Sequence, residues 1–183
     1  RERFGADEVA HKKYLNDYFT GKWPGSPSRG ELYNDDPRLG DARLCGTTAS
    51  LCGVEAAVHE QDPFQLERAV SCDLTLHAWM LSQSGIPVIY SGDEVGQLND
   101  YTYHDDPDKR DDSRYIHRGN FQWELAELRT DGSTRQGKQF QGLRRLEELR
   151  AKELCFDADA DVWTETSGDS RVLALCRRMG DRE

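Results

Sequence analysis

The sequence is poor in basic charge and in long apolar runs, and each shortage excludes a class of partner. Its 24 lysine and arginine residues are outnumbered by 34 aspartate and glutamate residues, which gives a net charge of −10. No basic stripe is present that could neutralise a phosphate backbone, so we expect no nucleic-acid partner. No apolar run approaches the roughly 20 residues of a membrane-spanning helix, so we expect no membrane partner.

Several motifs of catalysis and metal binding are also missing. The sequence has no glycine-rich phosphate loop, no nucleophile elbow and no zinc-type spacing, so we expect neither a cofactor nor a metal. Its five cysteines are odd in number and widely spaced, which is typical of reduced thiols rather than of a disulfide framework. This usage favours a cytoplasmic location. Secretion stays open, because residue 1 is arginine and the true N-terminus is not in view.

The composition and the two ends indicate a segment of a longer protein. Of the 183 residues, only 36% are hydrophobic and 32% are charged, so burial must be concentrated in a few segments. A strand-like run over 172–178 has little after it. We therefore expect a piece whose core is not self-sufficient.

Hydrophobic spacing predicts four helices, over 5–19, 47–58, 63–82 and 134–152. The third has the clearest start, because Asp62 can cap it and Pro63 suits the first helical position. Its apolar positions are so wide a stripe that we expect burial on most sides. Residues 21–46 carry turn residues without any period, which predicts a long irregular loop of functional importance.

The remaining apolar segments predict strands and place the chain in the α/β class. Residues 86–90 form a short apolar run after a helix, which is typical of an interior strand in a parallel sheet. Residues 162–166 and 171–177 alternate at period two around a Ser-Gly-Asp-Ser turn, which predicts a β-hairpin. A separate β domain would begin there.

Asp93 and Glu94 follow the predicted strand directly. Ligands bind at the carboxyl ends of strands in parallel α/β folds, so the pair is a candidate for acid/base chemistry or for holding an arginine. Alternatively, the carboxylates bond backbone amides of the next turn. His77, alone on its helix, is predicted to be a satisfied core histidine rather than a ligand.

The polar loop that follows offers a second candidate site. Arg114 and Arg118 enclose Tyr115 and His117, and guanidinium groups beside aromatic rings suit a neutral polyhydroxyl ligand. Alternatively, the arginines form ion pairs that hold the loop shut. The loop also holds aspartates at 105, 106, 108, 111 and 112, which lack the glycine and final glutamate of a calcium loop. They predict a solvated acidic loop rather than a metal site.

Two stretches resemble a known enzyme family. Gly-Ile-Pro-Val-Ile-Tyr-Ser-Gly-Asp-Glu-Val-Gly over 85–96, Leu-Asn-Asp over 98–100 and Asp-Asp-Ser-Arg-Tyr-Ile-His-Arg over 111–118 resemble the eighth barrel strand and following loop of the α-amylase family, and among its members the amylosucrases. Arg-Leu-Cys-Gly-Thr-Thr-Ala-Ser-Leu-Cys-Gly over 43–53 resembles the segment that closes their inserted B′ domain.

The resemblance implies the C-terminal portion of a (β/α)8 TIM barrel. Residues 1–60 would be a B′-like insertion after barrel strand seven, and 61–153 would hold helix seven, strand eight, the active-site loop and helix eight. Residues 154–183 would begin the C-terminal β domain. Residues 100–109 depart from the family pattern, which leaves acceptor preference and product length open.

The implied activity is that of a retaining glucosyltransferase on sucrose, which releases fructose and passes glucose to an α-1,4-glucan or maltooligosaccharide. The family's catalytic carboxylates lie outside this segment, so no catalytic residue is expected within it. Arg114 corresponds to an arginine that closes the glucosyl pocket through an ion pair with an outside aspartate, and Arg43 to one at the fructose or acceptor side. An α-glucosidase or sucrose hydrolase, or a non-catalytic carbohydrate- or calcium-binding module, are the alternatives.

Overall fold

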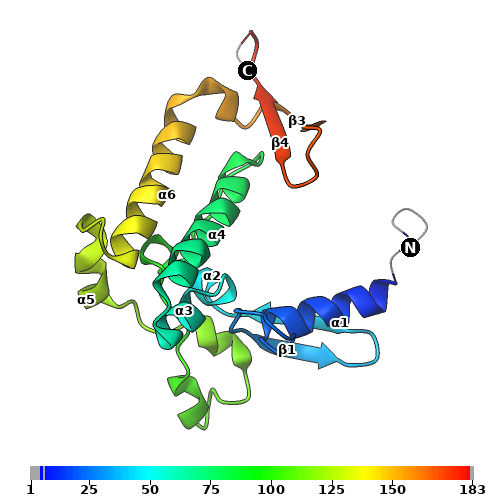
Figure 1. Ribbon diagram of the computed structural model, residues 1–183, viewed down its shortest axis with the longest axis vertical. Helices are drawn as coiled ribbons and strands as arrows, with labels where there is room; N and C mark the ends of the chain where they lie inside the picture. The colour runs from blue at the N-terminus through cyan, green and yellow to red at the C-terminus, as the bar shows by residue number, and fades with distance from the viewer. Residues whose placement is uncertain (1–4, 6, 182–183) are drawn as a thin grey trace.

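The computed structural model describes residues 5 and 7–181, and its elements form two arms that meet near the middle of the chain (Figure 1). One arm holds the long helices α4 (Pro63–Ser82) and α6 (Arg135–Lys152), and the other holds α1 (Glu8–Phe19) and the first β-hairpin. The helices and strands are α1 Glu8–Phe19, β1 Glu31–Asp36, β2 Asp41–Cys45, α2 Thr48–Leu51, α3 Val54–Glu60, α4 Pro63–Ser82, α5 Trp123–Ala126, α6 Arg135–Lys152, β3 Asp161–Thr166 and β4 Leu173–Arg178. The short 3-10 turns are η1 Asp93–Val95, η2 Thr102–Asp105, η3 Ser113–His117, η4 Glu127–Thr130 and η5 Leu154–Phe156.

Helix α4 begins where the sequence predicts. The carboxylate of Asp62 accepts hydrogen bonds from the backbone amides of Phe64 and Gln65, both at 3.0 Å, and Pro63 occupies the first turn. Its apolar face packs on α2 and α3 in one core cluster, which comprises Ala49, Val54, Ala69 and Val70 with Leu66, Leu74 and Leu98. The prediction that this helix is buried on most sides is wrong, because its Leu76 and Trp79 are exposed.

The helix predicted over 47–58 is two helices, and Gly53 separates them. Its φ of 95° is unfavourable for any residue with a side chain, and a Cβ there would lie 2.8 Å from the Pro27 side chain. The chain therefore turns between α2 and α3 instead of continuing as one helix.

Helix α6 packs along α4 and confirms the helix predicted over 134–152. Thr134 caps it by accepting a hydrogen bond of 3.0 Å from the amide of Gly137. Gly142 permits close approach, because a Cβ at that position would lie 2.6 Å from Leu74. The same two helices are also joined by a hydrogen bond, in which the side-chain amide of Gln139 donates to the buried carboxylate of Asp73 at 3.1 Å.

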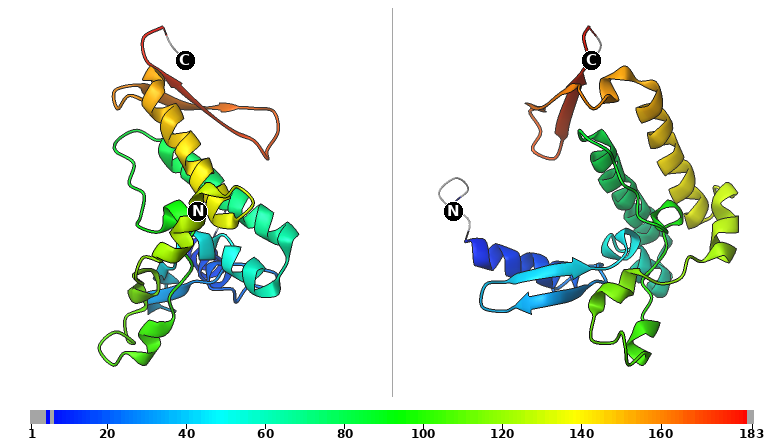
Figure 2. Two further views of the ribbon diagram at one scale, coloured as in Figure 1. Left: turned by 90° about the vertical axis from the view of Figure 1, so that its left-hand side faces the viewer. Right: turned by 180° about the vertical axis from the view of Figure 1, so that it is seen from behind.

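The prediction of an irregular loop over 21–46 is wrong, because much of this segment forms the antiparallel β1–β2 hairpin. Glu31 pairs with Cys45 and Tyr33 with Arg43. Helix α1 covers one face, where the side chain of Asn16 donates to the Gly40 carbonyl at 2.8 Å, and the loop over 100–118 covers the other (Figure 2). The strands have a stable partner on each face that no local pattern in the sequence reveals.

Residues 86–90, predicted as an interior strand, pair with no other strand in the part of the chain that the structure describes. Ile86 and Val88 are 92% and 77% exposed, and they alternate with the less exposed Pro87 and Ile89. A parallel strand needs neighbours that accept and donate its backbone hydrogen bonds. The barrel to which the segment was assigned stays a prediction.

The C-terminal hairpin β3–β4 confirms the one predicted from period-two alternation. Arg177 anchors it to the end of α4 and to the turn after α6, because its guanidinium donates to the carbonyls of Ser82, Cys155 and Asp157 at 2.7–2.8 Å. Across the residues described, no helix combines the length and apolarity needed to cross a membrane.

Candidate functional site

The loop over 100–118 is fixed on the β1–β2 hairpin by a small apolar cluster. Cys45, Tyr103 and Ile116 are buried together, with the rings of Tyr33 and Tyr115 against them. The hydroxyl of Ser113 also donates to the Leu32 carbonyl of β1 at 2.8 Å. The loop is therefore docked on the hairpin through these residues, while its aspartates at 105, 108 and 111 are exposed, as the predicted solvated acidic loop requires.

Arg114 of this loop makes both an ion pair and a ring contact. Its Nε donates to Asp112 Oδ1 at 2.8 Å and its Nη2 to Oδ2 at 2.6 Å, so the pair is bidentate. The guanidinium carbon is 4.3 Å from the centre of the Tyr33 ring. Hydrogen bonds from Arg114 lower the pKa of Asp112 to about 2, so the carboxylate stays charged at neutral pH. The ion-pair alternative weighed for this arginine is thus present, within its own loop.

Arg43, the second predicted substrate-binding residue, lies on β2 opposite Tyr33 of β1. It is the cross-strand partner of Tyr33, and directly opposed residues of an antiparallel pair project from the same face. Arg43 therefore projects from the face of the hairpin that carries Tyr33, the ring on which Arg114 is stacked. We call Arg43, Arg114, Tyr33 and Asp112 the arginine corner.

The aromatic side chains beside the arginine corner also hold cations. The guanidinium of Arg118 lies 5.5 Å from the centre of the Tyr115 ring, and the ammonium of Lys109 lies 5.8 Å from the same centre. The ring of His117 makes an edge contact with Tyr90 at 5.7 Å. Burial and the nearby Arg118 lower the pKa of His117, so its imidazole is neutral at neutral pH.

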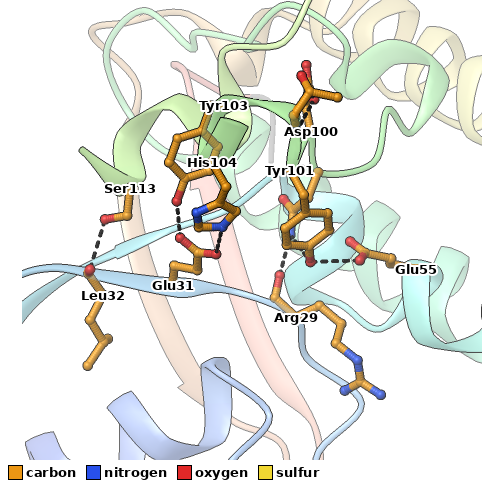
Figure 3. A network of polar contacts seen from close by, with 11 residues as sticks. Arg29, Glu31, Leu32, Glu55, Asp100, Tyr101, Tyr103, His104 and Ser113 are labelled. Atoms are coloured by element: carbon orange, nitrogen blue, oxygen red, sulfur yellow. Dashed lines mark hydrogen bonds and ion pairs between the residues drawn. The ribbon is translucent and has the colours of Figure 1, made fainter. Parts of the chain in front are cut away.

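A second network joins the same loop to β1 and α3 (Figure 3). Glu31 of β1 accepts hydrogen bonds from the Tyr103 hydroxyl and from His104 Nε2, the latter at 3.0 Å. The rings of Tyr103 and His104 are stacked with their centres 4.2 Å apart. Burial and Glu31 raise the pKa of Tyr103, which therefore remains a donor.

The other half of this network centres on Tyr101. Its hydroxyl donates to Glu55 Oε1 at 2.7 Å and accepts from the side-chain amide of Asn99 at 3.2 Å. Burial, with a contribution from Glu55, raises the pKa of Tyr101 to about 12. Glu31 and Glu55 are site residues that the sequence reasoning missed, since neither stands in a recognisable motif.

Asp93 belongs to a buried chain of charges. His77 Nδ1 lies 2.7 Å from Asp73 Oδ1, and His77 Nε2 lies 3.5 Å from Asp93 Oδ2. Burial alone would lower the pKa of His77, but its hydrogen bonds with Asp73 and Asp93 outweigh burial and raise the pKa to about 10. The imidazolium therefore links α4 to η1. His77 is buried and satisfied, as predicted, and it also orients Asp93.

Glu94 follows the alternative given for it. Its Oε2 accepts a hydrogen bond of 2.8 Å from the amide of Gly92, so the carboxylate closes the turn at η1. Two aspartates of the loop have basic partners: Asp112 pairs with Arg114, and Asp106 pairs with Lys109 at 2.8 Å. Within the described residues no group of three or more His, Cys, Asp or Glu side chains could hold a metal ion.

No known protein-family model matches the sequence. The residues that carry the resemblance fall in two separate segments. The hairpin register places Arg43 of the first segment opposite Tyr33, and Arg114 of the second segment is stacked on that tyrosine.

Proposed function

We propose that the chain forms one wall of the substrate pocket in an amylosucrase-like glucosyltransferase, with sucrose and an α-glucan as substrates. The observation that carries the proposal is the arginine corner, in which Arg114 is stacked on Tyr33 and oriented by Asp112. Sugars are bound by charged hydrogen-bond partners and by aromatic faces, and this corner supplies both.

The geometry of Arg114 fits the role that the resemblance implies. Asp112 occupies the Nε and Nη2 positions of the guanidinium. A guanidinium has five donors in a fixed plane, so the edge carrying Nη1 can reach a second carboxylate while Asp112 keeps the first edge. In the proposed pocket, that second carboxylate is the aspartate outside this segment, and the ion pair closes over the glucosyl ring.

The exposed apolar residues support the assignment to a barrel. Ile86 and Val88 alternate with less exposed neighbours, and Leu76 and Trp79 of α4 are exposed as well. Apolar surface of this kind normally marks an interaction site. A strand and helix of a (β/α)8 barrel would present such surface to the adjoining strands, which would come from outside this segment.

In the proposed reaction the chain's own residues bind and orient, and the bond-breaking carboxylates come from elsewhere in the barrel. A carboxylate attacks the glucosyl carbon, an acid protonates the departing fructose, and the glucosyl group then passes to an acceptor with retention of configuration. Arg114 positions the glucosyl unit, and Arg43 lies on the side where fructose leaves or the acceptor enters. Asp93, held by His77, helps to fix the turn after the eighth strand.

Replacing Arg114 tests the proposal, and the chain supplies a matched control. In the complete protein that contains this chain, Arg114→Ala should lower kcat/KM for fructose release from sucrose by about tenfold or more, which is about 1.4 kcal/mol of transition-state binding. Arg171 pairs with Asp169 two residues earlier in the same bidentate way, at 3.0 and 2.7 Å, in the exposed β3–β4 turn. Arg171→Ala should leave the rate unchanged. An Arg114→Ala enzyme within threefold of wild type would remove this arginine from the pocket.

The products distinguish the transferase from its hydrolytic relatives. Incubation of the complete protein with sucrose should give fructose together with a growing α-1,4-glucan. Glucose and fructose in equal amounts, without glucan, would instead assign the protein as a sucrose hydrolase. An absence of any reaction with sucrose would overturn the proposed substrate.

A further inference from the structure

A small cavity lies beside the buried chain of charges formed by Asp73, His77 and Asp93. Its volume is about 240 Å³, and it is lined by Thr48, Leu76, His77, Met80, Val88 and Asp93. Pockets that bind small molecules are usually larger, at roughly 300–1,000 Å³. The cavity therefore suits a single side chain better than a whole substrate or cofactor.

The chain of charges has two carboxylates and one cation. Burial lowers the pKa of His77, but its hydrogen bonds with Asp73 and Asp93 raise that pKa to about 10, so the ring is charged at neutral pH. His77 lies 2.7 Å from Asp73 and 3.5 Å from Asp93, so Asp73 holds the closer contact. Within the described residues, no lysine or arginine forms an ion pair with either aspartate. One negative charge is left without a matching cation.

Both carboxylates are largely withdrawn from water. Asp73 is fully buried, and its Oδ2 has no hydrogen-bond partner within the described residues. Asp93 keeps 11% of its side chain exposed, and it lines the cavity. Buried charges in proteins are normally paired, because an unpaired charge loses its hydration without compensation. The charge of the lining therefore favours a cationic occupant.

The apolar part of the lining suits the stem of a basic side chain. Leu76, Met80 and Val88 supply this surface, and lysine and arginine lay their methylene stems along apolar surface while the charged end reaches a polar group. Val88 is 77% exposed and belongs to the segment 86–90, which pairs with no other strand within the described residues. A neighbouring segment can therefore reach the cavity on the side of Val88.

We propose that Asp93 is an ion-pair site for a lysine or arginine side chain that enters this cavity from outside the 183 residues. The stem of the occupant lies against Leu76, Met80 and Val88, and its charged end reaches the Asp93 carboxylate. The pair joins the turn at η1 to the neighbouring part of the complete protein. This inference rests on the proposed function, because the proposed barrel supplies the neighbouring segment.

A substitution of Asp93 in a background without His77 tests the site. In the complete protein, His77→Gln removes the cation already seen beside Asp93, and Asp93→Asn is then added. If an outside cation is present, Asp93→Asn leaves it unpaired and should raise the equilibrium constant for urea unfolding by about tenfold or more. If none is present, the substitution removes repulsion between two carboxylates, and an unchanged or lower constant would overturn the proposal. Asp108→Asn in the same background is the control, because Asp108 is exposed in the polar loop and its loss should leave the constant unchanged.

Carboxylate labelling of the wild type gives a second test that needs no variant to fold. The complete protein is treated with a carbodiimide and glycine ethyl ester, and the labelled peptides are quantified. An occupied cavity should make Asp93 react with the ester as slowly as the fully buried Asp73, whereas the exposed Asp108 reacts readily. A lysine occupant would also form an amide with Asp93 by loss of water. Labelling of Asp93 faster than that of Asp73 would count against the proposal.

Fructose release from sucrose, measured on the same wild-type preparation, separates this inference from the proposed function. A protein that releases fructose but fails the two tests at Asp93 keeps its proposed function and loses only the ion-pair site. A protein that passes both tests without any reaction on sucrose has the ion-pair site, but its proposed substrate is wrong.

Discussion

Replacing His77 with glutamine should remove stability in a way that depends on pH. The histidine lies between two carboxylates, 2.7 Å from Asp73 and 3.5 Å from Asp93, and Asp73 is fully buried. Burial opposes the charged imidazolium, but the two carboxylates outweigh burial and raise its pKa from 6.5 to about 10. A group whose folded pKa is raised stabilises the fold fully below its unfolded pKa, and loses that contribution as pH rises through the folded value.

The size of the effect follows from the same two pKa values. Moving the pKa from 6.5 to about 10 corresponds to no more than about 5 kcal/mol, at about 1.4 kcal/mol for each pH unit. Asp93 keeps 11% of its side chain exposed, so water screens that end of the network and we expect about 2–3 kcal/mol. The contribution should be complete at pH 6, decline between pH 6.5 and 10, and be absent above that range.

Urea unfolding of the complete protein at several pH values measures this contribution. The wild type should lose about 2–3 kcal/mol more than His77→Gln between pH 6 and pH 10, so that the two stability curves converge at high pH. His59→Gln is the control, because His59 lies in the last turn of α3 outside this network, and its curve should run parallel to that of the wild type. Parallel curves for His77→Gln and wild type would show that the imidazolium is not stabilised by the carboxylates.

Two further substitutions test the packing and the loop. Gly142→Ala would place a Cβ 2.6 Å from Leu74 and should cost about 1–3 kcal/mol in urea unfolding, whereas an unchanged midpoint would mean that α4 and α6 are not in close contact. Glu31→Ala leaves the buried Tyr103 hydroxyl without its acceptor and should cost about 1–3 kcal/mol, with faster amide exchange over 102–106. The matched Glu8→Ala, which breaks an exposed helical pair with Lys12, should change stability by less than about 0.5 kcal/mol.

The helices were predictable because their signals are local. Asp62 and Pro63 fix the start of α4, and Thr134 fixes the start of α6. The β1–β2 hairpin was not predictable, because what holds its strands in place comes from residues far along the chain, such as Tyr103 on Glu31. Residues 86–90 show the opposite failure. Their composition is that of a strand, but a strand exists only when neighbours share its backbone hydrogen bonds.

The site was predictable in part. The sequence indicated Arg114 and its ion-pair alternative, and the resemblance paired it with Arg43. Asp112, the partner of Arg114, lies in the same loop and could be identified as a candidate from the sequence. Tyr33, the ring on which Arg114 stacks, could not, because its position depends on the hairpin register. Asp73 was overlooked, although its position four residues before His77 on a predicted helix places both side chains on one face. That spacing was the signal available for the buried charge network.

The docking of the acidic loop explains how a loop rich in aspartate holds the Arg114 side chain in a fixed position. Buried Tyr103 and Ile116 hold the loop on the hairpin, so its charged residues do not need to collapse around a metal to become ordered. Asp112 then fixes the plane of Arg114 on the Tyr33 ring before any ligand arrives. A side chain that is already ordered loses little conformational entropy on binding, so more of its interaction energy is available to the ligand. In the proposed function, the corner would therefore favour a rigid, planar contact with a hydroxyl-bearing ring or a second carboxylate.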